Sequence, residues 1–598
     1  MKPRPAHILK SVTGKSLPKN VIFFDTETSE VRLDDKRVEL VLKLGVAILT
    51  RRDRHNRFQR VDECRFYDVD TFTDWLTSVI KGKEKYYIVA HNIAFDIRVV
   101  GLLKYFSSHK WKRTMLIAEG VNFIASFRKD TTTVQLVNNQ QLFNVSLKKL
   151  GEAIGVYKKG IDFAAANDTE LLEYCVQDVV VMIEAWNFWV KYISDNDLGP
   201  FRLTAASQAM SAFRHRFLDE TVYIHNDERT IKLERESYHG GRVECFYIGT
   251  YSKGLVYNLD VNSMYPAMME SLPVPVKLLK YYERCPREVF ERNRRNYGYI
   301  VEAALDISEA VLPVKDGKRL LFPTGRVVGV FTKPEYEAAL EVGNVREVFR
   351  CAFYDERVAF HSFVDFFYTA RLAFREAGND QFAYISKLLL NSLYGKFGQK
   401  QNVYETVGKS INTPDGIYKS LEVGSGEWVK YRIIEGIVEK SVGFEEGYNS
   451  FVAVASYITA AARVLLAKYI RIAGRENVLY CDTDSLFVNA TGHDLLADYI
   501  DASALGKLKL VQNPDTLTIF GPKWYRFGDT TKLKGIRHNA RRVGEYTYEQ
   551  DKFLSFAGGL RSYHTNSVII ERVTKKLSRD YLKGELQPDG RVLPFELT

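Results

Sequence analysis

The chain has 598 residues, and at about 150 residues per domain it is expected to form about three to five structural units. Its composition, 46% hydrophobic and 26% charged, is that of a soluble globular protein, and no apolar run approaches the ~18 residues of a membrane span. A net charge of +10 favours a polyanionic partner. Six cysteines without a C-x-x-C pair argue against a zinc site and a disulfide framework.

The first third of the chain predicts a basic tail and an α/β unit. Residues 1–20 carry five Lys or Arg and no acidic residue, which indicates a flexible tail able to touch nucleic acid; an organellar transit segment is the alternative. The unit that follows, from residue 21 to about 190, contains apolar strands at Val21–Phe24 and Tyr86–His91. A long helical pattern covers Asp168–Tyr192.

The rest of the chain mixes strands, helices and turn-rich stretches. A Pro-containing region from Pro273 to about Arg350 is expected to be irregular, and 412–416 looks like the tip of a hairpin. No phosphate-binding loop is found, because Leu9 and Val403 stand where its first glycine is required. The remaining predicted elements, in order, are a strand at Gly254–Val261, helices at Phe360–Ala377, Asp380–Tyr394 and Ser450–Ile472, and a hairpin at Leu479–Val488.

A first acidic group lies in the N-terminal unit. Asp25 and Glu27 follow a buried-looking strand, and the period of two puts both carboxylates on one side, where they invite a divalent cation. Asp96 follows the second strand, and Tyr174 and Asp178 share one helix face. Such a group predicts two Mg²⁺ ions about 4 Å apart that activate a water for phosphodiester hydrolysis. The alternative for each fragment alone is a solvated surface.

A second acidic group is spread over the C-terminal two thirds. A strand delivers Asp260 to a sharp turn before Pro266, and a second apolar strand ends in a tight acidic turn with Asp482 and Asp484. An isolated D-T-D that binds calcium, or nothing, is the alternative.

A polar stripe and a basic run accompany this second group. Lys387, Asn391 and Tyr394 stand at i, i+4 and i+7 of an otherwise apolar helix, as expected for the lining of a nucleotide pocket. Residues 531–542 carry five Lys or Arg and no acid, which predicts contacts with backbone phosphates. An ordinary basic loop is the alternative.

Taken in order, these motifs resemble those of family B DNA polymerases that carry a 3′→5′ proofreading exonuclease. The resemblance runs from about residue 20 to the C-terminus. It implies that Asp260 and Asp484, supported by Asp482, hold the metal ions of synthesis. The exonuclease ions would be held by Asp25, Glu27, Asp96 and Asp178, and Tyr174 would orient the water. The residues that carry the resemblance are Asp25, Glu27, Asp96, Tyr174, Asp178, Tyr238, Asp260, Lys387, Asp484 and Lys523.

The resemblance also assigns residues to the incoming nucleotide. Tyr265 would be a steric gate that clashes with a ribose 2′-OH, with packing of the turn as the alternative. Arg371 would be a second triphosphate-binding cation, with a solvated helix face as the alternative. The full nucleotide-binding set is Ser263, Tyr265, Arg371, Lys387, Asn391 and Tyr394.

A larger set is expected to contact DNA. Lys523 and Tyr525 resemble the K-x-Y element that steadies a primer terminus, and Gly240 and Gly241 would allow close approach of a template strand. Lys159 matches a lysine that assists the exonuclease in the protein-primed branch of the family, and its neighbour Lys158 is an equal candidate. The DNA-binding set is His91, Asn92, Phe95, Ser146, Leu147, Tyr238, Gly240, Gly241, Lys523, Tyr525, Lys532 and Lys534.

Two stretches of extra sequence point to the protein-primed branch found in phages, viruses and linear plasmids. Asp260 and Lys387 are 127 positions apart (387 − 260), and Gln399–Asn449 is a second excursion. By resemblance these would be terminal-protein-region insertions, the first contacting a priming protein and DNA, the second closing a ring around the template for processivity and strand displacement. Expected partners are template-primer DNA, dNTPs and a terminal protein, with Mg²⁺ or Mn²⁺ as cofactor.

Together, the sequence and the resemblance predict a monomeric polymerase and exonuclease that is encoded by a virus or plasmid and acts in the cytoplasm of a host cell. The alternatives are a polymerase that uses nucleic-acid primers or none, and a nuclease with an inactive polymerase half. The expected fold is α+β multidomain, an RNase H-like exonuclease followed by a right-hand polymerase. The predicted units are a basic tail (1–20), exonuclease (21–195), palm (196–268), first insertion (269–359), fingers (360–398), second insertion (399–449), palm (450–535) and thumb (536–598).

Overall fold

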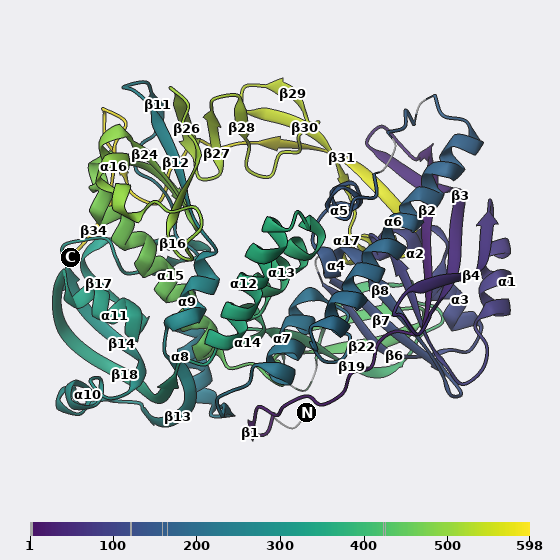
Figure 1. Ribbon diagram of the computed structural model, residues 1–598, viewed down its shortest axis with the longest axis horizontal. Coiled ribbons are helices and arrows are strands. Elements are labelled where there is room, and N and C mark those ends of the chain that lie inside the picture. The colour runs from purple at the N-terminus through teal and green to yellow at the C-terminus, as the bar shows by residue number, and fades with distance from the viewer. Residues whose placement is uncertain (1–3, 120–121, 158–159, 164, 423, 425) are drawn as a thin grey trace.

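The computed structural model describes residues 4–598 apart from 120–121, 158–159, 164, 423 and 425. Helices and strands combine in several units, and the larger units are each built on a sheet of their own (Figure 1). The predicted α+β multidomain class is confirmed.

A ten-stranded sheet forms the N-terminal unit. Strands β2, β5 and β8 are parallel neighbours, and antiparallel strands flank them. Side chains alternate between two cores, so that Val21 and Phe23 face one core while Ile22 and Phe24 face the other. The strands in the N-terminal part of the chain are β2 (Asn20–Arg32), β3 (Arg37–Arg52), β4 (Phe58–Phe66), β5 (Lys85–Ala90), β6 (Lys112–Glu119), β7 (Asn122–Lys129) and β8 (Thr132–Asn138).

Helices cover both faces of this sheet. The longest, α6, begins at a capping box made by Asn167 and Glu170 and packs on the face of Val21 and Phe23. The predicted strand at Val21–Phe24 continues to Arg32, so Asp25 and Glu27 lie inside it and do not follow it. The helices are α1 (Val69–Val79), α2 (Ile93–Val99), α3 (Leu102–Ser108), α4 (Asn139–Phe143), α5 (Leu147–Ala153) and α6 (Asp168–Asp195).

A five-stranded sheet in the order β10-β23-β24-β12-β25 carries the second acidic group. The long helix α15 packs against it; α15 is long and apolar enough for a membrane span, but 83% of that window is buried inside the protein, as in a core helix. The elements are β10 (Val243–Cys245), β12 (Val256–Val261), α9 (Met264–Ser271), α15 (Val452–Ala473), β23 (Val478–Asp482), β24 (Ser485–Asn489), α16 (Ala490–Leu495) and β25 (Leu508–Gln512).

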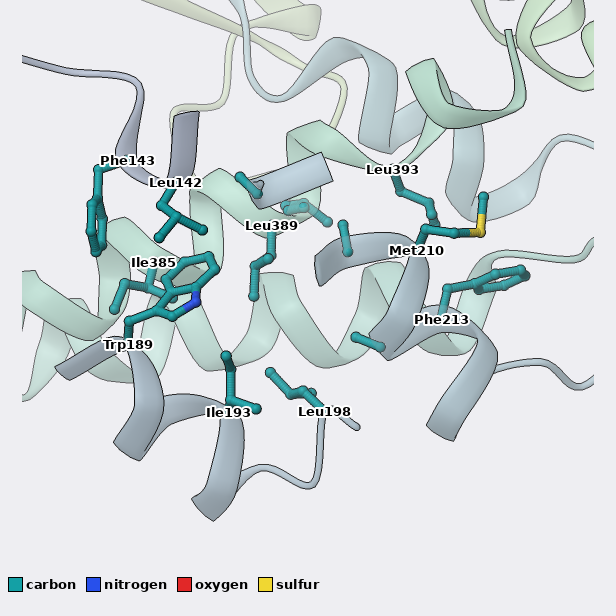
Figure 2. Packing of buried hydrophobic residues seen from close by; sticks show 14 of the residues in the cluster. Leu142, Phe143, Trp189, Ile193, Leu198, Met210, Phe213, Ile385, Leu389 and Leu393 are labelled. Carbon is teal, nitrogen blue, oxygen red and sulfur yellow. The ribbon is translucent and has the colours of Figure 1, made fainter. Parts of the chain in front are cut away.

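A helical layer joins these two units. Trp189 and Ile193 of α6 pack with Ile385 and Leu389 of α13, and α7 closes the same core with Phe213 (Figure 2). One continuous core therefore extends from the first sheet to the helix that carries the polar stripe. The helices are α7 (Ala205–Arg216), α12 (His361–Glu376), α13 (Asp380–Ser392) and α14 (Tyr394–Phe397).

The region predicted to be irregular, Pro273 to about Arg350, is instead most of a seven-stranded sheet with its own core. The prediction was wrong because Pro275 lies at a register shift of β13, where a strand tolerates the missing N–H. The elements are β9 (Tyr223–Ile224), α8 (Glu228–Ser237), β13 (Val274–Tyr282), α10 (Arg287–Asn293), β14 (Gly298–Ile307), β15 (Val314–Asp316), β16 (Arg319–Leu321), β17 (Thr324–Thr332), α11 (Lys333–Leu340) and β18 (Gly343–Arg357).

The N-terminal segment is not a free tail over its described residues. β1 (His7–Ile8) pairs with β9 at the edge of the seven-stranded sheet, and Leu9 is buried. The guanidinium group of Arg4 donates hydrogen bonds of 2.7 to 2.8 Å to the carbonyls of Gly447, Ser450 and His225. The prediction of a flexible tail for 1–20 is therefore wrong for residues 4–20.

The second excursion forms a four-stranded antiparallel sheet in the order β19-β22-β21-β20. The predicted hairpin tip at 412–416 is wrong, because the turn there joins β19 to β20, which lie at opposite edges of the sheet. The elements are β19 (Lys400–Lys409), β20 (Gly416–Leu421), β21 (Trp428–Ile434) and β22 (Ile437–Glu446).

The C-terminal part is divided between the two halves of the molecule and does not form one unit over 536–598. β31 pairs with β3, so β29 to β31 extend the N-terminal sheet, while β34 returns to β17 (Figure 1). The elements are β11 (Gly249–Tyr251), β26 (Leu517–Gly521), β27 (Trp524–Phe527), β28 (Thr530–Lys532), β29 (Arg541–Gly544), β30 (Thr547–Phe553), α17 (Phe556–Arg561), β31 (Val568–Lys576), β32 (Glu585–Leu586), β33 (Val592–Leu593) and β34 (Glu596–Leu597).

Candidate functional site

The structure brings three carboxylates of the first acidic group together. Oxygen atoms of Asp25 and Glu27, on β2, and Asp178, on α6, all lie within 4.8 Å of one another. Helix α6 crosses the face of the sheet that carries Val21 and Phe23, and residues 25 and 27 share that face by the alternation of the strand. Three close carboxylate oxygens match the ligand preference of Mg²⁺ and Mn²⁺.

Asp96 lies behind this cluster. Its side chain is 4% exposed and accepts a hydrogen bond of 2.8 Å from the hydroxyl of Thr26, the residue between Asp25 and Glu27. Burial, with a smaller contribution from the negative charge of Asp178, raises the pKa of Asp96 to about 7. A nearby cation would stabilise the charged form of this carboxyl group, because the cation offsets the free-energy cost of burying the negative charge.

Two further exonuclease candidates differ in how they are placed. Tyr174 lies one helical turn before Asp178 on α6, and its ring meets Phe163 edge to face at 5.2 Å. Lys159, and with it Lys158, lies outside the described residues. Cys175 donates to the carbonyl oxygen of Asp25 at 3.3 Å, and burial raises the pKa of this thiol well above its usual value.

The second acidic group is assembled by strand pairing. Asp260 on β12 is the register partner of Ser485 on β24, and the N–H of Val261 donates to the carbonyl of Asp484 at 2.7 Å. Asp260 and Asp484 are therefore neighbours across the ladder. The pKa of Asp484 is raised to about 6, chiefly by burial and then by the negative charges of Asp260 and Asp482.

Two lysines balance these carboxylates. Lys509 Nζ lies 2.7 Å from an oxygen of Asp260, and Lys523 Nζ lies 3.2 Å from an oxygen of Asp482. Lys509 comes from β25, the other neighbour of β12, where it is the register partner of Asp260. A divalent ion at Asp260 and Asp484 would compete with Lys509 for the same oxygen atom.

The turn between Asp482 and Asp484 explains why residue 241 is a glycine, whereas it does not explain Gly240. Thr483 adopts a left-handed conformation with φ 65°, and its N–H donates to the carbonyl of Arg242 at 2.7 Å. A Cβ on Gly241 would lie 2.7 Å from Thr483 Cγ2, whereas a Cβ on Gly240 would meet no protein atom within 4 Å. Gly241 thus makes room for the acidic turn itself.

A buried ion pair fixes this glycine loop from behind. Arg463 of α15 donates to the carbonyls of His239 and Gly240 at 2.8 and 2.9 Å and forms a 2.6 Å ion pair with Glu335. Both charged side chains are at most 1% exposed.

Aromatic rings line the neighbouring surface. Tyr265 of α9 stacks on Tyr394 of α14 with ring centroids 4.6 Å apart. Burial raises the pKa of Tyr265, and the charge of Asp484 adds to this shift. A Cβ on Gly398 would lie 2.7 Å from the ring of Tyr238, so that this ring packs tightly against the end of α14.

Cations gather on the other side of Asp260. Arg371 of α12 is 5% exposed and donates to the hydroxyl of Ser263 at 3.1 Å, so the alternative of a solvated helix face is wrong. The pKa of Lys387 is lowered, chiefly by desolvation and then by the charges of Arg371 and Lys509. Asn391 donates to the carbonyl of Lys387 at 2.8 Å and has an exposed side chain.

The DNA-binding candidates of the first unit fall into two groups. Asn92 and Ser146 are exposed at the starts of α2 and α5, and Phe95 is half-buried. His91 is held by Asn139 at 3.0 Å and by the carbonyl of Val145. Leu147 is 8% exposed and packs in the core, so its side chain does not offer a surface to DNA, contrary to the prediction.

The candidates near the C-terminus surround the acidic turn. The N–H of Lys523 donates to the hydroxyl of Tyr480 at 2.9 Å, and Tyr525 packs against the same ring at 5.4 Å. Lys532 Nζ lies 6.0 Å from the ring centre of Tyr525. Lys534 is exposed and follows β28.

The sequence prediction missed Thr26, Lys509, Thr483 and Arg463. Thr26 and Thr483 stood inside predicted motifs, and the position of each between two candidate metal-ligating carboxylates is a signal that could have found it. Lys509 and Arg463 gave no local signal, since their contacts depend on pairing and packing across the fold.

Comparisons with known proteins agree with this geometry. Residues 156–427 match the family described as DNA polymerase type B, organellar and viral. The DNA-directed DNA polymerase of Enterobacteria phage PRD1 is 28% identical over 471 residues, which cover 78% of this chain and 76% of that polymerase. A "probable DNA polymerase" of Neurospora intermedia is 27% identical over 440 residues, which cover 69% of this chain and 43% of that protein.

A solved structure shares the fold. Phi29 DNA polymerase, complexed with primer-template DNA and incoming nucleotide, superposes with a TM-score of 0.68 at 17% sequence identity. The match covers 94% of this chain and all of that one. At 17% sequence identity, the structural similarity shows a shared fold and nothing further.

Proposed function

The chain belongs to the type B DNA polymerases of the organellar and viral kind, and from this premise we propose that it both extends and trims DNA strands at two separate sites. The observation that carries the proposal is the pair of acidic clusters on two different sheets. Asp260 and Asp484 belong to the site of synthesis. Asp25, Glu27, Asp96 and Asp178 belong to a 3′→5′ exonuclease.

At the site of synthesis, the described contacts suit an incoming dNTP. Arg371 and Lys387 supply positive charge for a triphosphate next to Asp260, and the backbone at Ser263 turns in the left-handed region beside them. The stacked rings of Tyr265 and Tyr394 offer a flat wall for the sugar and base of the new pair. Two Mg²⁺ ions bound by Asp260 and Asp484 would lower the pKa of the primer 3′-hydroxyl and balance the charge of the leaving pyrophosphate.

At the exonuclease site, the protein positions a strand end over the carboxylates. Exposed polar groups at the starts of α2 and α5, from Asn92 and Ser146, are suited to a single strand that enters beside Asp25. Tyr174 is placed to orient the attacking water by its position one turn from Asp178. Mn²⁺ would serve in place of Mg²⁺, since both prefer oxygen ligands.

We further propose that synthesis starts on a terminal protein in the cytoplasm of a host cell, on a linear viral or plasmid genome. Two added sheets support this step, one over 274–357 and one over 400–446, because they give surfaces beyond what strand extension requires. Priming from ordinary oligonucleotides remains the second candidate. Co-purification from the native source should yield a nucleotide bound covalently to a second protein; its absence, with efficient extension of oligonucleotides, would favour the second candidate.

Paired variants test the two-site proposal. Asp484→Ala should abolish nucleotide incorporation and keep degradation of single strands, because the two clusters share no residue. Asp25→Ala with Glu27→Ala should do the reverse. Asp494→Ala, which removes an 82% exposed carboxylate from the same half as Asp484, is the matched control and should keep both activities. Loss of both activities in a folded Asp484→Ala protein would contradict two independent sites.

A further inference from the structure

A cavity of about 510 Å³ lies at the end of the five-stranded sheet that is far from Asp260. Val478 and Asn489, the first residue of β23 and the last of β24, line it. Asn489 lies four residues along β24 (489 − 485) from Ser485, the register partner of Asp260, which is about 13 Å of strand. The volume falls in the range of roughly 300 to 1,000 Å³ that is typical of small-molecule sites. The cavity is therefore separate from the site of synthesis.

The C-terminal segment forms one wall of this cavity. The N–H of Ile248 donates to the carbonyl of Gly590 at 2.7 Å, and the N–H of Val592 donates to the carbonyl of Phe246 at 2.8 Å. These backbone hydrogen bonds hold the segment around β33 against the end of the sheet. The walls of the cavity are thus fixed by the fold.

Aromatic rings line the cavity. The rings of Tyr247 and Tyr251 meet edge to face with centroids 5.9 Å apart, and Phe246 is a third ring in the lining. A Cβ on Gly590 would lie 2.9 Å from the ring of Tyr247, so this ring is held close against the C-terminal segment. Flat rings in fixed positions suit a planar aromatic group of a ligand.

Arg475 brings a positive charge to the same lining. Its guanidinium group lies over the ring of Phe246, 4.5 Å from the centroid, and donates to the carbonyl of Val592 at 3.3 Å. Among the residues that the structure describes, this half-buried group has no other hydrogen bond and no ion pair. The carboxylate of Glu244, whose charge also acts on Arg475, is already paired with Arg242 at 2.5 Å. Because polar groups away from water are as a rule hydrogen-bonded, this fork calls for an external acceptor, and a phosphate fits two of its N–H groups at once.

The remaining charges of the cavity add a second kind of contact. Lys253 is exposed and forms no ion pair in the described part of the chain, whereas Arg591 is paired with Asp589 at 2.5 Å. Glu476 is exposed in the same lining and likewise has no ion-pair partner over 4–598 outside the undescribed positions. A carboxylate accepts hydrogen bonds from hydroxyl groups such as those of a sugar. Cations alone would suit a bare phosphate, but the carboxylate and the rings add contacts for a sugar and a base.

We propose that this cavity binds a free nucleoside phosphate, at a third site apart from both acidic clusters. Arg475 and Lys253 bind the phosphate, and Glu476 accepts a hydrogen bond from a sugar hydroxyl. The base lies against the rings of Tyr247 and Tyr251. A DNA strand would need cations spaced along a path, whereas the cations here converge on one cavity, so the free nucleotide is the better match.

Binding of dAMP to the full chain, without DNA and in EDTA, tests the proposal, because nucleotide binding at the acidic clusters depends on divalent ions. Equilibrium dialysis with radiolabelled dAMP gives the affinity of wild type and of each variant. Arg475→Met keeps an apolar side chain over Phe246 and removes every donor. Arg295→Met is the matched control, because it removes an exposed arginine beyond α10 that forms no ion pair with any described residue.

Wild type should bind dAMP more tightly than inorganic phosphate or deoxyadenosine, because only dAMP contacts both the cations and the rings. Arg475→Met should bind dAMP at least about tenfold more weakly through the loss of charged hydrogen bonds, and Arg295→Met should bind it like wild type. Lys253→Gln changes an exposed side chain and leaves the core intact. It should weaken dAMP binding about threefold and make binding less sensitive to salt.

Equal binding of dAMP and inorganic phosphate, or no binding of dAMP by wild type, would overturn the proposal. So would unchanged binding in Arg475→Met or, if that variant does not fold, in Lys253→Gln. An affinity for a single-stranded oligonucleotide that depends on Arg475 and exceeds the affinity for dAMP would assign the cavity to DNA and also overturn it.

The failure of this inference can be told from failure of the proposed function. Extension and trimming of DNA by wild type in Mg²⁺ test the two acidic clusters, whereas dAMP binding in EDTA tests the cavity alone. A wild type that extends and trims DNA but does not bind dAMP in EDTA refutes only the third site.

Discussion

Gly241→Ala should disable synthesis by displacing the acidic turn, although Gly241 itself carries no chemistry. An alanine Cβ would lie 2.7 Å from Thr483 Cγ2 and 2.9 Å from Thr483 Oγ1. Carbon atoms in contact prefer about 3.5 to 4.0 Å, so Thr483 has to move by about 0.8 Å or more. Thr483 stands between Asp482 and Asp484 and is tied to Arg242 by its N–H, so the turn moves with it.

The magnitude follows from that displacement. Misplacing a catalytic group by about 1 Å costs on the order of 100-fold in rate, and overpacking a buried contact costs roughly 1 to 3 kcal/mol of stability. Gly241→Ala should therefore lower kcat for single-nucleotide incorporation about 100-fold. Exonuclease activity on single strands should stay near wild type, because Asp25 and its partners lie on another sheet.

Single-turnover incorporation and single-strand degradation are the two assays, and two further variants complete the test. Thr483→Gly removes all three of the atoms that approach a Cβ at position 241 and suits φ 65°, so Gly241→Ala with Thr483→Gly should recover most of the loss. Gly240→Ala is the matched neighbour, with no protein atom within 4 Å of its Cβ. Equal losses in Gly240→Ala and Gly241→Ala, or no recovery in the double variant, would refute the steric reasoning and favour close approach of DNA to both glycines.

Three other predictions concern the surroundings of the sites. In metal-free protein, the melting temperature should fall as pH rises from about 4 to 7, because the folded protein keeps a proton on Asp96 (pKa about 7) that the unfolded chain has already lost. Asp96→Asn should flatten the plot of melting temperature against pH. An unchanged slope in this variant would contradict the assignment of the slope to Asp96. Arg463→Met should lower the melting temperature by roughly 10 °C, since Glu335 is left buried and unpaired, and adding Glu335→Met should restore part of it. Arg4→Ala should lower the melting temperature by a few degrees and speed proteolysis within residues 399–449, without changing either activity; Arg4→Lys, which lacks the fork, should not rescue it.

The sequence predicted the local parts of both sites because their signals are short-range. An apolar strand that ends in carboxylates made Asp484 a candidate. The alternation of β2 put Asp25 and Glu27 on one side, even though the strand runs further than expected. The stripe on α13 was likewise visible from its spacing. These features depend on a few neighbouring residues, so the sequence alone carries them.

Long-range pairing was not predictable in the same way. Lys509 reaches Asp260 only because β25 pairs with β12, and nothing near residue 509 indicates this partner. The prediction of a single C-terminal unit over 536–598 was wrong for the same reason. β31 pairs with β3, and the paired residues Leu40 and Val568 are 528 positions apart in the sequence (568 − 40). In the first added sheet, Pro275 suggested irregular structure because a register shift cannot be read from composition.

The core between the two sites limits how the molecule can move. Trp189 and Ile193 of α6 pack in one core cluster with Ile385 and Leu389 of α13 (Figure 2). Tyr192 of α6 shares a 2.6 Å hydrogen bond with Ser386 of α13. Helix α6 carries Asp178 and α13 carries Lys387, so moving one acidic site relative to the other would open a close-packed interior and leave that hydrogen bond unmade. Transfer of a strand end between the sites is therefore expected to proceed by movement of the DNA over a fixed spacing.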